Sequence, residues 1–384
     1  MDCSLYIHIP FCRTKCDYCD FFSVPCGNQS VSDFYVESLC NEIAFRAKCY
    51  NIESFSTVYV GGGTPSILSD LQLKKIMQTV FSLSKQKPLE ISIEVNPDDV
   101  TEELLKSIRD VGFNRLSCGL QAFDQDVLKA VNRRSSLETV RNAVKLIREH
   151  WKGIFSADVI AALPGQTEEV FLNGLSELAE ASPHHISMYS LTVEDETPLG
   201  KRFLAGNEEY DYEAADEMWL KGRDFLEQHG YSQYEVSNFS RPGFECKHNM
   251  VYWKLEDYIG CGSGATGTLY KKGLRFTNTK NIAEYVDFWK NPSELSLAPG
   301  ISEEIDFEIQ QFEFFMMGLR TLKGICKETF EERFGKAFPV KAVQLFGKWQ
   351  TEGKAFVKTE GGRTWYGLNK KGILFLNAFL KDLL

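Results

Sequence analysis

The sequence predicts an α/β fold: a partial (β/α)6 barrel with a mixed α+β C-terminal domain that ends in a winged-helix-like module. Short apolar runs alternate with amphipathic helical patterns through the first half of the chain, which is typical of parallel βαβ units. Glycine or polar residues follow these apolar runs, as they do at the carboxyl ends of barrel strands, where ligands bind. Near residue 200 the alternation stops, and short helices and a hairpin pattern close the sequence.

Six strand candidates carry the barrel prediction: Leu5–Ile9, Thr57–Val60, Ile91–Val95, Arg115–Leu120, Ser156–Ala162 and His185–Thr192. The amphipathic helices predicted between them are Val31–Lys48, Asp70–Leu83, Glu102–Val111, Leu137–Glu149 and Glu168–Ala181. Because βαβ units are right-handed and keep their strands parallel, six repeats predict an incomplete barrel rather than the closed eight-stranded one.

The second half divides into a linking region, 201–300, and a C-terminal region, 301–384, after a barrel domain of 1–200. The linking region predicts a long helix, Glu208–Gln228, and a strand, Tyr231–Asn238. The C-terminal region predicts the helices Ser302–Arg320, Cys326–Phe334, Val340–Trp349 and Ile373–Leu384, with a hairpin over Phe356–Leu368. Winged-helix modules bind DNA when they are basic, and no dense basic face is present here. We therefore expect a lid or a protein-docking element.

Composition narrows the class of protein. The 384 residues include 43 basic and 53 acidic side chains, a net charge of −10, which argues against nucleic-acid binding. Eleven cysteines, mostly scattered singly, are typical of a reducing compartment. The N-terminus shows no secretory signal, and no apolar run is long enough to span a membrane. These features predict a soluble cytoplasmic protein without stable membrane insertion; they leave the oligomeric state open, with a homodimer as one alternative.

Three cysteines, Cys12, Cys16 and Cys19, follow the first predicted strand at Cys-x3-Cys-x2-Cys spacing. Three thiolates on one loop can hold a [4Fe–4S] cube and leave one iron without a protein ligand. Structural zinc would need a fourth ligand, usually from a second cysteine pair, and the spacing is not that of a secreted disulfide framework. The pattern resembles radical S-adenosylmethionine (radical SAM) proteins, in which the amino and carboxylate groups of SAM chelate the open iron.

The residues after the other strands supply groups that a nucleoside needs. Gly61-Gly62-Gly63-Thr64-Pro65 follows the second strand, Glu94-Val95-Asn96-Pro97 the third, and Gln121 the fourth, with Arg133 shortly beyond; Asp158 lies at the fifth. Each alone is explained by a tight turn or a solvated loop residue. Their shared position favours one site, in which carboxylate and amide groups bind ribose hydroxyls and other donors bind a carboxylate.

With the run Tyr6-Ile-His-Ile-Pro-Phe-Cys12, these motifs resemble the oxygen-independent coproporphyrinogen III oxidase family across residues 1–200. The resemblance implies a radical SAM barrel and a SAM site. Two departures from the oxidase pattern stand out: Phe21 replaces a fourth cysteine, and the chain starts at the first strand without the oxidase's N-terminal extension. Both features belong to the oxidase's substrate site, so oxidative decarboxylation of coproporphyrinogen III becomes the alternative function. The residues implied at the SAM site are Tyr6, Tyr18, Gly62, Gly63, Thr64, Glu94, Gln121, Arg133 and Asp158, with backbone near Thr192.

The segment Cys246-Lys-His248-Asn249-Met-Val-Tyr252-Trp253 resembles the heme-chaperone branch of that family. The resemblance implies a protein that binds heme in the linking region and passes it to an acceptor protein, whose identity the sequence does not reveal. His248 is the first candidate for the axial ligand of heme iron, and in an extended segment it would share a face with Tyr252. The Cys246 thiolate is a competing ligand, and a merely packed histidine is the structural alternative.

Overall fold

The computed structural model describes residues 1–206 and 209–383. Six parallel strands form the centre of a sheet that is twelve-stranded within these residues. As predicted, these strands alternate with helices along the chain. Their order across the sheet is the same as their order in the sequence. The central strands are β1 (Asp2–Ile9), β4 (Ser54–Gly62), β5 (Glu90–Val95), β6 (Arg115–Gln121), β7 (Ile154–Ala161) and β8 (His185–Ser190).

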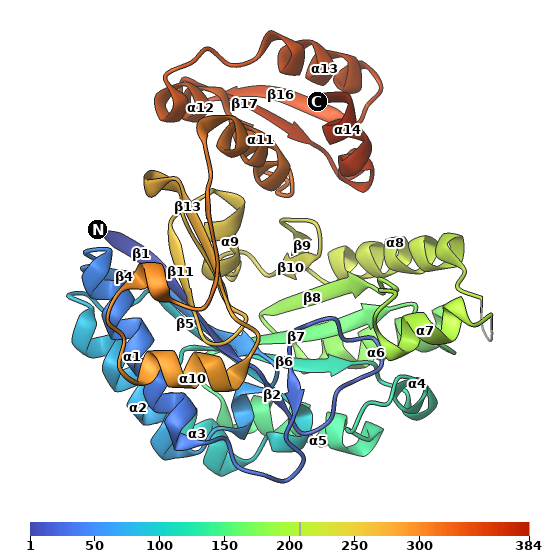
Figure 1. Ribbon diagram of the computed structural model, residues 1–384. Coiled ribbons are helices and arrows are strands. Elements are labelled where there is room, and N and C mark those ends of the chain that lie inside the picture. Colours follow the sequence, from blue (N-terminus) through green and yellow to red (C-terminus); the bar gives the residue numbers. More distant parts are fainter. Residues whose placement is uncertain (207–208, 384) are drawn as a thin grey trace.

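The helices between these strands cover the outer face of the sheet (Figure 1). Hydroxyl side chains accept a backbone N–H at the start of several of them, which satisfies donors that the helix itself leaves unpaired. Ser69 and Gln72 form a capping box at α2, and Thr101 and Thr167 cap α3 and α6. These helices are α1 (Asp33–Cys49), α2 (Asp70–Leu83), α3 (Glu102–Val111), α4 (Gln125–Ala130), α5 (Leu137–His150) and α6 (Glu168–Ala181).

The six central strands do not close into a barrel, because further strands pair with both edge strands, β1 and β8. Next to β8 lie β10 (Asn238–Ser240) and then β9 (Ser232–Gln233), so the predicted strand Tyr231–Asn238 is wrong in extent. Next to β1 lies β11 (Tyr258–Cys261), in parallel, followed by antiparallel β12 (Thr266–Leu269), β13 (Leu274–Asn278) and β14 (Gly300–Glu304). The partial barrel is therefore confirmed, and the region 201–300 extends its sheet on both sides.

Four more helices complete this part of the molecule. The predicted long helix is α8 (Tyr212–Gln228), capped by Asp211; the predicted start at Glu208 lies outside the described residues. Sequence analysis missed α7 (Pro198–Leu204) and α10 (Ile282–Lys290), whose backbone accepts hydrogen bonds from Ser38 and Asn41 of α1. It also predicted an extended segment where α9 (Lys247–Trp253) is helical.

The C-terminal elements form a separate module, orange to red at the top of Figure 1. A three-stranded antiparallel sheet, β15 (Ile325–Cys326), β17 (Arg363–Leu368) and β16 (Ala355–Glu360), packs with α11 (Phe307–Gly318), α12 (Lys327–Phe334), α13 (Val340–Thr351) and α14 (Leu376–Leu383). Its apolar core is distinct from that of the barrel. The hairpin turns at Gly361 and Gly362, where φ is 59° and 77°, as its sequence predicts. The boundaries at 200 and 300 stay predictions.

Among the described residues, no helix combines the length and apolar character that a membrane crossing requires.

Candidate functional site

A cavity of about 400 Å³ lies at the carboxyl ends of the parallel strands. Side chains from the cysteine loop, from β4 to β8 and from α9 line it. Most of the residues singled out in the sequence meet here, although they come from different strand ends. The predicted residues in the lining are Cys12, Cys16, Tyr18, Cys19, Gly62, Gly63, Thr64, Glu94, Gln121, Arg133, Asp158 and Thr192.

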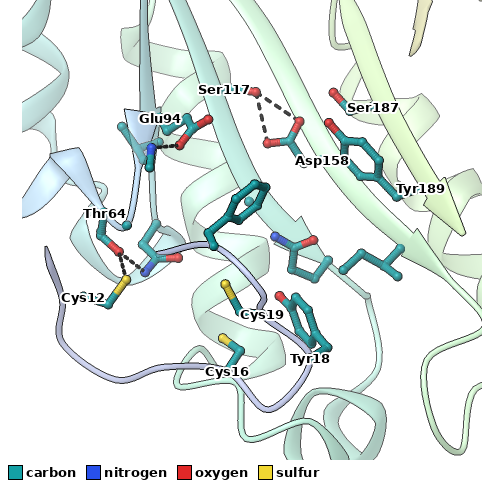
Figure 2. Close-up of a pocket in the computed structure, with 18 of the residues that line it drawn as sticks. Cys12, Cys16, Tyr18, Cys19, Thr64, Glu94, Ser117, Asp158, Ser187 and Tyr189 are labelled. Atoms are coloured by element: carbon teal, nitrogen blue, oxygen red, sulfur yellow. Dashed lines mark hydrogen bonds between the residues drawn. The ribbon is translucent and has the colours of Figure 1, made fainter. Parts of the chain in front are cut away.

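The cysteine loop leaves β1 and is closed at its base by two short strands, β2 (Phe11–Cys12) and β3 (Val24–Pro25). None of its three motif cysteines forms a disulfide, and the loop lies along the lower edge of the cavity in Figure 2. The Thr64 hydroxyl donates to Cys12 Sγ over 3.4 Å, and Arg133 Nη1 donates to Cys16 Sγ over 3.4 Å. Burial raises the pKa of the Cys19 thiol to about 11.

The three sulfurs do not converge on one point: no three acidic, histidine or cysteine side chains of the described residues are grouped to hold a single ion. A [4Fe–4S] cluster does not need its thiolates at one point, because each of them binds a different iron. The donor set of three thiols and a neighbouring guanidinium therefore suits an anionic cluster rather than a lone cation.

The glycine loop after β4 lies directly against the cysteine loop. A Cβ at Gly62, where φ is 112°, would lie 2.5 Å from the His8 ring, and one at Gly63 would lie 2.6 Å from the Phe11 carbonyl oxygen. Gly63 N also donates to the Ile9 carbonyl over 2.8 Å. Only glycine permits this close approach, which places backbone N–H groups at the cavity wall.

Two half-buried carboxylates, Glu94 and Asp158, face the cavity from different strands (Figure 2). Glu94 accepts from the Tyr59 hydroxyl over 2.8 Å and from Gly62 N over 3.0 Å. Asp158 accepts from the Ser117 hydroxyl over 3.0 Å. Burial raises the pKa of Glu94 to about 7 and that of Asp158 to about 6. Such carboxylates gain free energy from a cationic or hydroxyl-bearing ligand, which offsets their desolvation.

Gln121 and Arg133 have different surroundings. Gln121 ends β6 with a φ of 69°, beside a register shift, and this left-handed conformation is uncommon for a residue other than glycine. Arg133 Nη2 donates to the Asn96 side chain and to the Gly119 carbonyl, while Nη1 reaches Cys16. Arg133 therefore ties the cysteine loop to the ends of β5 and β6 at the cavity wall.

Two predicted site residues, Tyr6 and His248, are not among the lining residues. The Tyr6 hydroxyl is hydrogen-bonded to His8 Nδ1 at 2.8 Å, and its ring lies against that of Tyr59. His248 is 1% exposed, with Nδ1 2.8 Å from Thr57 Oγ1 and Nε2 2.9 Å from the Tyr252 hydroxyl. Neither nitrogen of His248 is free to bind iron in this structure.

The predicted extended conformation of this segment is wrong, because the carboxylate of Glu90 caps a helix here. It accepts the backbone N–H groups of Lys247 and His248 over 3.2 and 2.9 Å and the Cys246 thiol over 3.5 Å. Burial raises the pKa of that thiol to about 12. His248 and Tyr252 do share a face, but through the i, i+4 spacing of a helix.

Several lining residues were not predicted from the sequence: Tyr59, Ser117, Ser187, Tyr189 and Asn249. On β7 and β8, the inward positions alternate as Ser156 and Asp158 and as His185, Ser187 and Tyr189. A closed barrel fills such positions with bulky aliphatic side chains. Polar residues, rather than aliphatic ones, at every second strand position were therefore the available signal for an interior cavity.

Comparison with known proteins agrees with this geometry. The family model of the radical SAM superfamily matches residues 6–178, and that of the HemN C-terminal domain matches residues 309–349. The heme chaperone HemW of Lactococcus lactis is 36% identical over 352 residues, which cover 91% of this chain and 88% of the relative. HemW of Escherichia coli is 32% identical over 382 residues, covering 98% of this chain and 97% of the relative.

The structure of coproporphyrinogen III oxidase (HemN) from Escherichia coli, a radical SAM enzyme, superimposes with a TM-score of 0.82. The match covers 99% of this chain and 89% of that one, at 24% identity. At this identity the likeness establishes the fold, including the open sheet and the C-terminal module.

Proposed function

Because this chain belongs to the family of the heme chaperone HemW, within the radical SAM superfamily, we propose that it binds heme and transfers it to an acceptor protein. The observation that carries the proposal is the extent of the match: relatives of that name align with 85% to 98% of this chain. A match of this length includes the C-terminal module and α9 as well as the barrel.

We further propose that Cys12, Cys16 and Cys19 hold a [4Fe–4S] cluster, the cofactor that radical SAM membership implies. The loop offers three thiols at the cavity, and Thr64 and Arg133 donate to two of the sulfurs. When bound, such a cluster supplies an open iron for the amino and carboxylate groups of SAM and an electron for its sulfonium. Arg133 and Thr64 stabilise the negative charge of the thiolates and fix the loop.

The other lining residues are proposed to bind SAM. Glu94 and Asp158 accept hydrogen bonds from hydroxyl or ammonium groups, and their burial strengthens these bonds. Gln121 offers its side-chain amide at the cavity wall, and Gly62 and Gly63, which lack a Cβ, let a ligand approach the backbone closely. Tyr18 lines the cavity beside the cysteines, whereas Tyr6 supports the site from behind Tyr59.

For heme iron, His248 stays the predicted ligand only if α9 rearranges when heme binds. Its hydrogen bonds to Thr57 and Tyr252 occupy both ring nitrogens, and its side chain is buried. Heme would otherwise take its ligand elsewhere on the chain.

Heme transfer is the experiment that tests the chaperone proposal. Anaerobically reconstituted protein, loaded with one equivalent of heme, is incubated with a heme-free acceptor, and the Soret absorbance of each is followed after separation. We expect the rate of heme transfer to the acceptor protein to exceed the rate at which the same heme-loaded protein loses heme to apomyoglobin in the absence of the acceptor. Failure to bind heme at all would refute the proposal.

Oxidative decarboxylation of coproporphyrinogen III is the second candidate, because the chain retains a complete candidate SAM cavity. Phe21, which stands in the place of the oxidase's fourth cysteine, is 69% exposed at the edge of that cavity. Because residue 21 is phenylalanine, this chain has no thiol at the position of the oxidase's fourth cysteine. We expect no vinyl product when the protein is incubated anaerobically with SAM, reductant and coproporphyrinogen III; steady turnover would favour the oxidase.

A further inference from the structure

A line of side chains connects α9 to the candidate SAM site. The imidazole of His248 stacks on the ring of Tyr59, with centroids 5.3 Å apart and an interplanar angle of 28°. The Tyr59 hydroxyl donates to Glu94 Oε1 over 2.8 Å, and Glu94 Oε2 accepts from Gly62 N over 3.0 Å. The line therefore runs from a helix of the linking region to the glycine loop of the barrel.

We propose that His248 is a positioning residue of the SAM site, which acts through Tyr59 to hold the Glu94 carboxylate in place. The inference rests on the proposed SAM-binding role of this cavity. It assigns the histidine of α9 to the barrel's own ligand rather than to heme iron.

The hydrogen bonds of His248 suit this role. Burial lowers the pKa of His248 to about 3, so the ring is neutral and carries one donor and one acceptor nitrogen. Thr57 and Tyr252 occupy these two nitrogens, so the ring cannot rotate about its own axis without losing a bond. A ring fixed in this way presents one flat face to Tyr59, whose phenol is then held towards Glu94.

The position of α9 supports the same assignment. The neighbours of His248 in sequence, Cys246 and Asn249, line the cavity, so α9 is part of its wall. Glu90, which caps α9, also accepts from Arg115 of β6 over 3.4 Å, and both side chains are buried. Helix α9 is therefore attached to β5 and β6 at its first turn and supports β4 through His248.

A double-mutant cycle on SAM affinity tests the proposal in the reconstituted full chain. His248→Leu fills the space of the imidazole but has no flat face, and Tyr59→Phe removes only the hydroxyl. We expect each to weaken SAM binding on the order of 5- to 10-fold, about the value of one ordinary hydrogen bond, because the Glu94 carboxylate remains and only its position is loosened. The double variant should bind no more weakly than Tyr59→Phe, because both changes remove the same contact.

His248→Phe and Lys247→Ala complete the design. His248→Phe restores an aromatic face and should recover affinity to within about twofold of the wild type, which a purely structural role would not explain. Lys247 is exposed on the same helix, so Lys247→Ala should bind SAM normally. Additive losses in the double variant, or unchanged SAM affinity in His248→Leu, would overturn the inference.

The Soret band of the heme complex shows whether His248 instead binds heme iron, and SAM binding by the wild type shows whether the cavity has its proposed function. We expect the Soret band of His248→Leu to match the wild type; a shifted band with unchanged SAM affinity would identify an iron ligand instead. If the wild-type protein with an intact cluster fails to bind SAM, the proposed function of the cavity fails, and not the role of His248 alone.

Discussion

Two segments of this chain carry motifs that suggest iron ligands, and the fold treats them in opposite ways. The loop of Cys12, Cys16 and Cys19 turns its side chains towards a cavity, with only single donors from Thr64 and Arg133 at the sulfurs. Helix α9 buries Cys246 and His248, and Glu90, Thr57 and Tyr252 occupy their polar atoms.

The comparison shows that residue type and spacing can suggest a metal ligand. Whether a side chain can bind metal in the folded chain depends on lone pairs that no hydrogen bond occupies. The sulfurs on the loop keep lone pairs beyond those that accept from Thr64 and Arg133, so they can bind metal without breaking an internal hydrogen bond of the fold. His248 would have to break at least one buried bond, which costs about 1–3 kcal/mol for the partner left unsatisfied. The cysteine loop therefore has side chains available to bind a ligand, whereas those of Cys246 and His248 are engaged within the fold.

The largest expected effect separates the two segments directly. Cys16→Ala should abolish the brown chromophore and most of the bound iron, because two thiolates cannot retain the cube. Iron and sulfide analysis after anaerobic reconstitution measures this, with Cys26→Ala as control, since Cys26 lies outside the motif at the base of the loop. Full iron content in a variant that lacks Cys12, Cys16 and Cys19 would contradict the assignment.

Next in size is the loss of a cavity carboxylate. Asp158→Ala and Glu94→Ala should each weaken SAM binding by about 1.5–3 kcal/mol, roughly 10- to 150-fold, while cluster content is unchanged. Equilibrium dialysis with labelled SAM provides the measurement. Asp126→Ala, at a 95% exposed side chain on α4, is the matched control. Normal affinity in both cavity variants would eliminate this SAM site.

A smaller effect concerns the pH dependence of stability without SAM. Glu94 and Asp158 ionise at higher pH in the folded chain than in the unfolded chain, where their pKa values are near 4.5 and 3.8. The folded state then holds more protons between pH 4 and 7, so the free energy of unfolding falls as the pH rises through this window. The loss is on the order of 1–3 kcal/mol per carboxyl.

Urea unfolding of the wild type and of Glu94→Gln at pH 5 and pH 8 measures this contribution. We expect the variant to lose less stability than the wild type between the two pH values, and saturating SAM to remove part of the difference. Equal losses in the two proteins would mean that Glu94 is not desolvated as its burial indicates.

The smallest expected effect belongs to Cys246. Its thiol is 2% exposed and protonated, so Cys246→Ala should leave the Soret band of the heme complex where it lies in the wild type. A shift on this substitution would show that α9 opens when heme binds and that the thiolate reaches the iron. Absorption spectra of the ferric and ferrous complexes decide between these outcomes.

Sequence patterns predicted the barrel well, because five of the six helices between its strands carry their own local signals; the short α4 (Gln125–Ala130) was not predicted. Helices α2, α3 and α6 begin and end at the predicted residues, where Ser69, Thr101 and Thr167 precede an amphipathic run. The loop motifs at strand ends likewise predicted which side chains meet at the cavity, since parallel strands end at one edge of a sheet.

What the sequence did not reveal depends on distant partners. Helix α9 forms where Glu90, from a strand far earlier in the chain, caps its first N–H groups. The position of Tyr6 behind Tyr59 depends on His8, which binds its hydroxyl, and the outer strands depend on pairing with β1 and β8. No window of local sequence contains these interactions, so periodicity could not indicate them.

The pairing of β1 has a consequence for synthesis. The strand that precedes the cysteine loop leaves the ribosome long before one of its two neighbours, β11 (Tyr258–Cys261). Until that segment emerges, the outer edge of β1 offers unpaired backbone groups, and buried Glu42 of α1 lacks Gly262 N and the Asn278 amide as partners. Nascent chains shorter than this are therefore exposed to edge-to-edge association. The proposed iron–sulfur cluster, whose cysteines follow β1, is then best inserted after translation has passed the linking region.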